Sequence, residues 1–329
     1  MQRSLSGIQP SGTLHLGNYF GAMKQFIENQ NSGKYEGFYF IADYHALTSL
    51  TNPEVLREST KNIILDYLAI GLDPEKSTLY LQSDVPEHVE LSWLLSNITP
   101  VGLMERGHSY KDKVAKGLFP NTGLLTYPIL MACDILIYDT DIVPVGKDQK
   151  QHLEMTRDLA MKFNQQYNVD FFKLPEPLIL DELAIVPGID GQKMSKSYGN
   201  TINMFAPKKV LKKQVMSIVT DSTPLEEPKN PDNNVSQLYK LFVTEEKYQE
   251  MRDKFKAGGY GYGHAKKELF EAILEYFKEA RARREELEKN PSYVEEVLRK
   301  GALKARAIAI KKITEAKKIV GLMGNVYNK

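Results

Sequence analysis

The sequence predicts an α/β protein in which a doubly wound, Rossmann-like parallel sheet is followed by a C-terminal α-helical domain. Short apolar runs alternate with longer amphipathic stretches over the first two hundred residues, and strand–helix–strand order with short connections is typical of a parallel sheet covered by helices. After Thr201 the chain becomes polar and shows only helical periodicity. We therefore expect three parts: residues 1–190, residues 191–295, and a last helix within 296–329 that packs back on the first part.

The individual elements follow from local patterns. Apolar runs predict four strands, at Leu5–Ile8, Phe38–Ala42, Thr78–Gln82 and Ile142–Val145. Helical spacing begins near Gly17, Asn52 before Pro53 is a helix-start signal, and another helix is expected from Lys150 to Tyr167. Periodicity in the C-terminal part predicts helical segments near 207–219, 235–242, 244–257, 263–289 and 292–321.

Composition excludes several classes of protein. The chain has 329 residues and one cysteine, Cys133, which rules out an intrachain disulfide and a cysteine-rich zinc or iron–sulfur site. Its first residues lack the apolar core of a signal peptide, and no apolar run reaches the length of a membrane span. We expect a cytoplasmic protein with no membrane partner.

Charge is distributed unevenly. Residues 1–201 carry 17 Lys and Arg against 24 Asp and Glu, whereas residues 202–329 carry 26 against 18. The basic excess is densest in 299–318, with eight basic residues and one acidic residue. Such a surface suits a polyanion, although a solvated face of a lysine-rich helix explains the pattern equally well.

The first chemical motif is the run from Gly7 to Asn18, where the first strand meets the first helix. A helix start exposes unpaired backbone N–H groups and the positive end of the helix dipole, which suit phosphate. Gly12 and Gly17 allow close approach to the backbone, and His15 and Asn18 can donate hydrogen bonds. Taken alone, the tetrapeptide 15–18 is also compatible with helix capping and a surface histidine.

The second motif is Lys193-Met194-Ser195-Lys196-Ser197, with glycines on both sides. Flanking glycines favour a mobile loop. Two lysines in such a loop can neutralise polyphosphate charge. The alternative is an exposed basic loop without a ligand.

Together these motifs resemble the paired HIGH and KMSKS signatures of class I aminoacyl-tRNA synthetases. His15 and Lys193 lie 178 positions apart, with the α/β pattern between them. The resemblance implies that the two motifs jointly bind ATP, and that His15, Asn18, Lys113, Lys193 and Lys196 take part in catalysis. It implies nucleotide contacts from Gln9, Pro10, Ser11, Gly17, Asn18, Gly146, Lys147, Asp148, Ile185, Lys193, Met194, Ser195, Lys196 and Ser197.

Asp134 is a carboxylate within an otherwise apolar stretch, 123–136, and burying it is costly without a partner. An indole ring offers one N–H donor and no acceptor, so a buried carboxylate can recognise it, and Met131 can pack on an aromatic ring. Asp134 as a helix cap, or paired with a nearby base, remains the alternative.

The stretch 123–136 also resembles the specificity helix of bacterial tryptophanyl-tRNA synthetases, and 141–154 resembles a second block of that family. Leu5 and Cys133 depart from the residues common there. The resemblance implies that Gln149 holds the α-amino group of tryptophan. It implies a tryptophan pocket made of Leu5, Gly7, His45, Tyr127, Met131, Asp134, Val143, Val145 and Gln149.

The implied activity is activation of L-tryptophan with ATP, followed by transfer to tRNA(Trp). Magnesium is expected with ATP, held by phosphates and water, and no protein-bound metal site is expected. The resemblance also implies a homodimer whose late helices recognise the anticodon. The alternatives are a tyrosyl-tRNA synthetase, a small nucleotidyltransferase, and a non-catalytic paralogue that binds RNA or a protein. Trp93, the lone tryptophan, is expected in the core or an interface.

Overall fold

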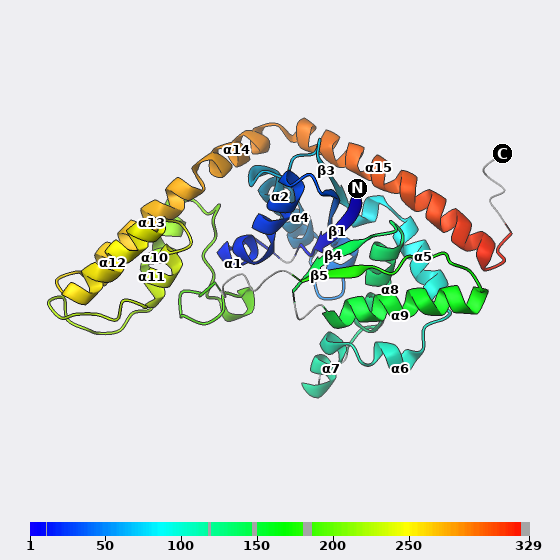
Figure 1. Ribbon diagram of the computed structural model, residues 1–329, viewed down its shortest axis with the longest axis horizontal. Coiled ribbons are helices and arrows are strands. Elements are labelled where there is room, and N and C mark those ends of the chain that lie inside the picture. Colours follow the sequence, from blue (N-terminus) through cyan, green and yellow to red (C-terminus); the bar gives the residue numbers. More distant parts are fainter. Residues whose placement is uncertain (11, 118–119, 147–149, 180–185, 324–329) are drawn as a thin grey trace.

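A five-stranded parallel sheet forms the centre of the computed structural model, which describes residues 1–10, 12–117, 120–146, 150–179 and 186–323 (Figure 1). The strand order is β3-β2-β1-β4-β5, so the order reverses between β1 and β4, as in doubly wound folds. The strands are β1 (Gln2–Ile8), β2 (Tyr35–Ile41), β3 (Ser77–Leu81), β4 (Ile142–Val145) and β5 (Glu176–Ile179). The first four confirm the sequence prediction, and β5 was missed because its Glu176 and Pro177 break the apolar run.

The helices account for most of the remaining chain. In the first part they are α1 (Leu16–Asn18), a π-helical turn (Tyr19–Met23), α2 (Lys24–Asn31), α3 (Asp43–Ala46), α4 (Pro53–Ala69), α5 (Glu87–Ser96), α6 (Val101–Met104), α7 (His108–Ala115), α8 (Thr122–Leu136) and α9 (Lys150–Tyr167). In the second part they are α10 (Lys208–Met216), α11 (Asn234–Tyr239), α12 (Glu245–Ala257), α13 (Tyr262–Tyr276), α14 (Lys278–Lys289) and α15 (Pro291–Ile319). Short 3₁₀ turns cover Gln82–Asp84 and Lys196–Tyr198. Across the described residues, no helix combines the length and apolarity needed to cross a membrane.

One predicted helix start is present, and one predicted helix is divided in two. The predicted cap is present, since the Asn52 side chain accepts hydrogen bonds from the backbone N–H groups of Glu54 and Val55. The single helix expected over 263–289 is instead divided between α13 and α14 at Phe277, whose buried ring packs edge-on against Tyr19. A tertiary contact therefore interrupts a locally continuous pattern.

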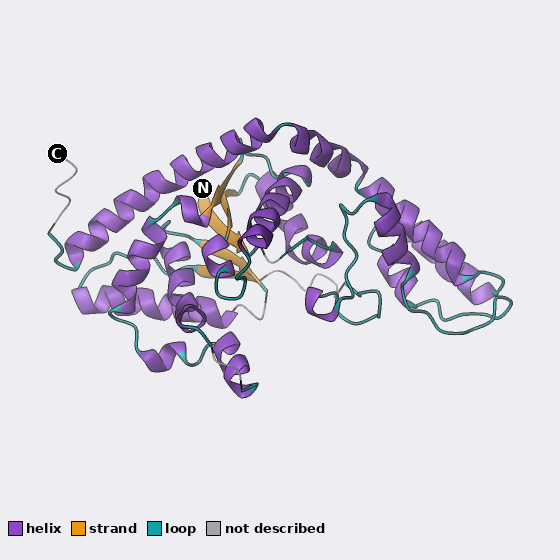
Figure 2. Cartoon of the chain, turned by 180° about the vertical axis from the view of Figure 1, so that it is seen from behind, coloured by secondary structure: helices purple, strands orange, loops and turns teal. Residues whose placement is uncertain are grey.

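Each face of the sheet carries its own apolar core. Alternate residues of β2 divide between them, with Phe38 and Phe40 on one face and Tyr39 and Ile41 on the other, as the two-residue repeat of a strand requires. The core that contains Tyr39 runs on into α10–α13. The region formed by α10–α13, at the right in Figure 2, is thus joined to the sheet by continuous apolar packing.

Helix α15 arches over the molecule and lies against the edge strand β3 (Figure 1). Its Gly301 approaches the strand so closely that an added Cβ would lie 1.8 Å from the carbonyl oxygen of Leu79. Only glycine fits this approach. The helix protects an edge that would otherwise expose unpaired backbone groups.

The basic residues of α15 are mostly paired, a feature that neither reading of the 299–318 segment includes. Six of its eight basic side chains form ion pairs: Arg299 and Lys300 with Glu296, Lys304 with Glu36, Arg306 with Glu87, Lys312 with Asp139, and Lys317 with Glu90. Four of these pairs join α15 to the first part of the chain. Part of the opposite charge of the two halves therefore contributes to the docking of α15.

A buried ion pair joins α14 to α4. Arg284 Nε lies 2.6 Å from Asp66 Oδ1, and Arg284 also donates to the Asn62 side chain at 2.8 Å. Burial raises the pKa of Asp66 to about 6, although Arg284 opposes the shift. The pair ties the helical region to the helix that runs beside the sheet.

Candidate active site

A cavity of about 700 Å³ opens at the carboxyl ends of β1, β2 and β4. Strands β1 and β4 pair at one position only, Ser4 with Ile142, so their carboxyl ends separate beyond it. Ligands of doubly wound proteins bind at this reversal of strand order, and the volume suits a small molecule.

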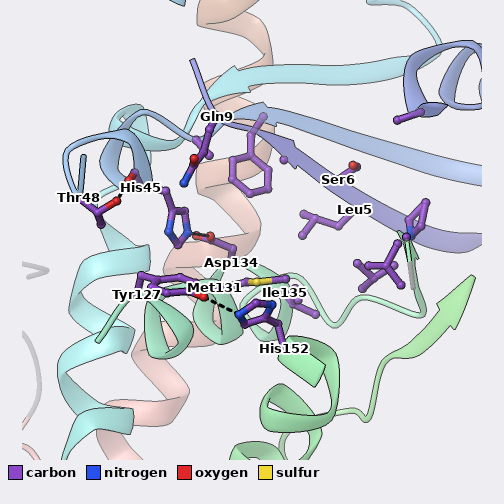
Figure 3. A pocket seen from close by; sticks show the side chains of 18 of the residues that line it. Leu5, Ser6, Gln9, His45, Thr48, Tyr127, Met131, Asp134, Ile135 and His152 are labelled. Carbon is purple, nitrogen blue, oxygen red and sulfur yellow. Dashed lines mark hydrogen bonds and ion pairs between the residues drawn. The ribbon is translucent and has the colours of Figure 1, made fainter. Parts of the chain in front are cut away.

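Eight of the nine residues expected to bind tryptophan line this cavity: Leu5, Gly7, His45, Tyr127, Met131, Asp134, Val143 and Val145 (Figure 3). Gln9 and Gly146, expected at the nucleotide, line it too. Gly7 is required because an added Cβ would lie 2.4 Å from the ring of Phe40. The structure thus brings together residues from two strands, β1 and β4, and two helices, α3 and α8, that are far apart in the sequence.

Asp134 is the buried charge of the cavity wall, with 1% of its surface exposed. His45 Nε2 lies 2.8 Å from its Oδ2, Gln82 Nε2 donates to both carboxylate oxygens at 2.8 and 3.0 Å, and His88 Nδ1 contacts Oδ1. Burial alone would raise the pKa of Asp134, but hydrogen bonds from His45 and His88 lower it below its usual value. The carboxylate is therefore ionised, and the facing ring nitrogens must donate.

The partners of Asp134 lie on different sides. His45 lines the cavity together with Asp134, whereas Gln82 and His88 are not part of the lining and are fully buried. Sequence reasoning missed both. Gln82 directly follows β3 and His88 is the second residue of α5, the next α-helix. The general rule that ligand-site residues follow the carboxyl ends of parallel strands could therefore have indicated them.

The two sequence motifs meet in space. The backbone N–H of Gly17 donates to Met194 Sδ over 3.4 Å, and the N–H of Leu16 donates to the carbonyl of Ile202 at 3.0 Å. Lys196 Nζ lies 3.8 Å from the position of a Cβ on Gly12. Met194 is buried in the core that contains Leu16. It anchors the lysine loop next to the histidine turn, as the resemblance requires.

Asn200 closes the lysine loop, a role that sequence reasoning missed. Its side chain donates to the Asp190 carboxylate and the Lys193 carbonyl, and accepts from the N–H of Ser195 at 2.8 Å. Asn200 also fills the space beside Gly188, where a Cβ would lie 2.3 Å from its amide nitrogen. In this arrangement the loop has a defined fold that leaves Lys193 exposed.

His15 is buried beneath this loop with 5% exposure. Burial first, and the nearby Lys196 charge second, lower its pKa to about 4, so it is neutral at pH 7. Its Nδ1 is buried and has no hydrogen-bond partner among the described residues. Asn18 accepts from the His15 backbone N–H at 3.1 Å, which leaves its amide N–H groups for a ligand.

This pKa predicts how stability depends on pH. Unfolded His15 titrates near 6.5, so between pH 6.5 and about 4 the unfolded state binds more protons than the folded state. The free energy of unfolding should therefore decrease as the pH is lowered from 6.5 to about 4. His15→Gln, which cannot titrate, should lose less stability than wild type. Denaturation at pH 7, 5.5 and 4.5 measures the difference, and parallel loss in both proteins would contradict the buried neutral state.

The remaining expected residues are placed less centrally or lie outside the described residues. Pro10 is buried next to Gln9, and Ser195 and Ser197 share a hydrogen bond at 2.8 Å. Lys113 lies in α7, at the lower edge of the molecule in Figure 1. Ser11, Lys147, Asp148, Gln149 and Ile185 lie outside the described residues. In the described part of the chain, no group of three or more His, Cys, Asp or Glu side chains could hold a metal ion.

Comparison with known proteins identifies the family. Residues 2–278 match the family described as "tRNA synthetases class I (W and Y)". The chain belongs to this family. It is 75% identical to the tryptophan–tRNA ligase of Fusobacterium nucleatum over 99% of this chain and all of that protein. It is 53% identical to the enzyme of Rhodopirellula baltica over 97% of this chain and 99% of that protein.

Solved structures of the family share the whole fold. The tryptophanyl-tRNA synthetase of Campylobacter jejuni, in a complex with ADP and tryptophan, is 51% identical. It matches with a TM-score of 0.92 over 98% of this chain and all of that one. A tyrosyl-tRNA synthetase from Archaeoglobus fulgidus, 22% identical over 86% of this chain and 90% of that one, has a TM-score of 0.59 and shares the fold alone. The synthetase thus resembles tryptophan enzymes more closely than this tyrosine enzyme.

Proposed function

We propose that this synthetase is a tryptophan–tRNA ligase that forms tryptophanyl-adenylate and pyrophosphate from L-tryptophan and ATP, and then transfers tryptophan to tRNA(Trp). The observation that carries the proposal is the ionised Asp134 in the wall of a largely apolar cavity. Since indole has one N–H donor and no acceptor, a single buried carboxylate satisfies it. The relatives named tryptophan–tRNA ligase support the same substrate.

The lining favours tryptophan over tyrosine. A phenol both donates and accepts, so a tyrosine site needs a donor beside its carboxylate. In the structure the donors His45, Gln82 and His88 are directed at Asp134 itself. Met131 lines the same wall and offers a soft apolar surface to a large ring.

Adenylate formation requires the tryptophan carboxylate to attack the α-phosphorus of ATP in line with the leaving pyrophosphate. The chain contributes positioning and charge neutralisation. His15 and Asn18 can donate to phosphate oxygens, and Lys193 and Lys196 approach from the opposite loop. Magnesium would enter with ATP, held by phosphates and water, and would neutralise part of the phosphate charge.

Amino-acid-dependent exchange of pyrophosphate into ATP tests the proposal. Stimulation by tryptophan is the expected result. Stimulation by tyrosine alone would favour a tyrosyl-tRNA synthetase, and stimulation by neither would favour a nucleotidyltransferase or a non-catalytic paralogue. Charging of tRNA(Trp) then tests the second step.

Lys196→Ala is expected to slow single-turnover adenylate formation by about 100-fold, because a preorganised cation near developing phosphate charge contributes on this order. Tryptophan binding should change less than about threefold, since Lys196 lies at the Gly12 turn and not in the cavity lining. Rapid quench of adenylate formation and calorimetric titration with tryptophan measure the two effects. Lys247→Ala, at an exposed position in α12, is the control. An unchanged single-turnover rate would remove Lys196 from the mechanism.

We also propose that the synthetase is a cytoplasmic homodimer with the domains 1–190, 191–295 and 296–329. An apolar surface supports the dimer: Leu47, Val89 and Trp93 are 54%, 47% and 71% exposed. Leu47 and Val89 line one groove, and Trp93 lies one turn beyond Val89 in α5. Large exposed apolar side chains gathered in one place are typical of interfaces.

Trp93→Lys should weaken self-association by at least about tenfold, because a buried interface tryptophan often contributes 2 kcal/mol or more. Sedimentation velocity across a concentration series measures the change. Leu303→Lys, which is 58% exposed on α15, is the matched control. A wild-type protein that stays monomeric at micromolar concentration would contradict the dimer.

Basic residues outside α15 support the proposed RNA partner. Helix α10 presents four exposed lysines, Lys208, Lys209, Lys212 and Lys213. Within the part of the chain that the structure describes, none of them forms an ion pair. Unpaired lysines on one short helix suit the phosphate backbone of tRNA.

A further inference from the structure

His88 lies behind Asp134, on the side away from the cavity. It is fully buried on α5 and uses both ring nitrogens. Nδ1 contacts Asp134 Oδ1, and Nε2 lies 2.7 Å from the hydroxyl oxygen of Tyr138. Neither His88 nor Tyr138 lines the cavity. The imidazole therefore bridges two groups and touches no cavity space.

The direction of these hydrogen bonds follows from the protonation states. The ionised Asp134 can only accept, so His88 Nδ1 carries a proton and donates. Burial raises the pKa of Tyr138, so this phenol keeps its proton, and its hydroxyl oxygen lies within hydrogen-bond distance of His88 Nε2. The Tyr138 hydroxyl thus holds the ring of His88 from one side, while the other ring nitrogen supplies a hydrogen bond to the Asp134 carboxylate.

The other contacts of Asp134 do not fix its rotation in the same way. Gln82 Nε2 lies 2.8 and 3.0 Å from the two oxygens, nearly midway between them. His45 contacts only Oδ2 and faces the cavity, where a ligand would compete for the same oxygen. His88 contacts Oδ1 and not Oδ2, and it does so from the protein interior. Its contact can therefore persist while a ligand binds.

We propose that His88, supported by Tyr138, is a positioning residue for amino-acid specificity. It holds the Asp134 carboxylate in the orientation that accepts a hydrogen bond from a ring N–H of the substrate. The inference rests on the proposed function. A site that presents a fixed acceptor rejects an analogue without the donor, because the acceptor is then left unpaired. A carboxylate free to rotate would lose part of that discrimination.

The test compares tryptophan with its benzothiophene analogue, in which sulfur replaces the ring N–H. The ratio of kcat/KM for tryptophan to kcat/KM for the analogue is measured by pyrophosphate exchange in wild type, His88→Leu, His88→Asn and Tyr138→Phe. In His88→Leu the ratio should fall by about 30-fold or more, while the KM for ATP stays within about threefold. His88→Asn places an amide N–H near the position of Nδ1 and should restore most of the ratio. Tyr138→Phe should lower it by about three- to tenfold.

The control is His264→Asn, the same substitution at an exposed position of α13, which should leave the ratio unchanged. A folded His88→Leu that loses activity equally for both amino acids would overturn the proposal, because purely structural damage has that signature. If His88→Leu does not fold, Tyr138→Phe decides, and an unchanged ratio there overturns the proposal. Wild-type exchange that tryptophan fails to stimulate would contradict the proposed function itself, whereas tryptophan-dependent exchange with an unchanged ratio in the variants contradicts only the role of His88.

Discussion

Asp134→Asn is expected to raise the KM for tryptophan by about 100-fold, or about 2.7 kcal/mol, while the KM for ATP changes less than about threefold. The substitution keeps the size of the side chain but removes the charge that we propose attracts the indole N–H. It also turns an amide N–H toward a group of donors, because His45, Gln82 and His88 all point at this side chain. Steady-state pyrophosphate exchange at varied tryptophan and varied ATP measures both constants.

The same substitution should also lower stability, because three buried donors lose an ionised acceptor. Breaking a buried network from one side costs about 3 kcal/mol, so the assays belong well below the melting temperature of the variant. Asp253→Asn, on the exposed side of α12, is the matched control. Equal losses for tryptophan and ATP would mean that Asp134 supports the fold of the site and does not recognise the amino acid.

Gly301→Ala is expected to lower the free energy of unfolding by about 3 kcal/mol or more, although alanine is the better helix former. The added Cβ would lie 1.8 Å from the Leu79 carbonyl oxygen. That oxygen belongs to β3 within the sheet and cannot move alone. The helix must therefore shift away from the strand, which strains the ion pairs that Lys304 and Arg306 make beside it. Calorimetric melting measures the loss, and limited proteolysis should show an α15 that is cut more readily.

Gly263→Ala provides the control, because Gly263 lies in α13 and an added Cβ would meet nothing within 4 Å. Its melting temperature should stay the same or rise slightly, as helix propensity predicts. A Gly301→Ala protein as stable as wild type would show that α15 does not approach the strand so closely in solution.

Local patterns were sufficient where an element depends on its own residues. The apolar runs of β1 to β4 and the Asn52 cap appear in the structure close to where the sequence predicts them. Strand β5 was not predictable in this way, because Pro177 and Glu176 have low strand preference and the segment pairs with β4 through its backbone. The break at Phe277 likewise depends on the ring of Tyr19, which is far away in the sequence.

The residues of the candidate site also differ in whether the sequence or only the tertiary structure indicates their role. The sequence by itself indicated the histidine motif, the lysine motif and the carboxylate at Asp134, because these residues lie in short, distinctive segments. Most of the cavity lining was expected from the resemblance to tryptophanyl-tRNA synthetases. Only the tertiary structure decided that Met194 anchors the lysine loop under Gly17, that His88 and Gln82 hold Asp134 from behind, and that the basic α15 docks on acidic partners. Each of these contacts joins two segments that are far apart in the sequence and meet only after the chain has folded. The local pattern of either segment therefore does not predict the contact.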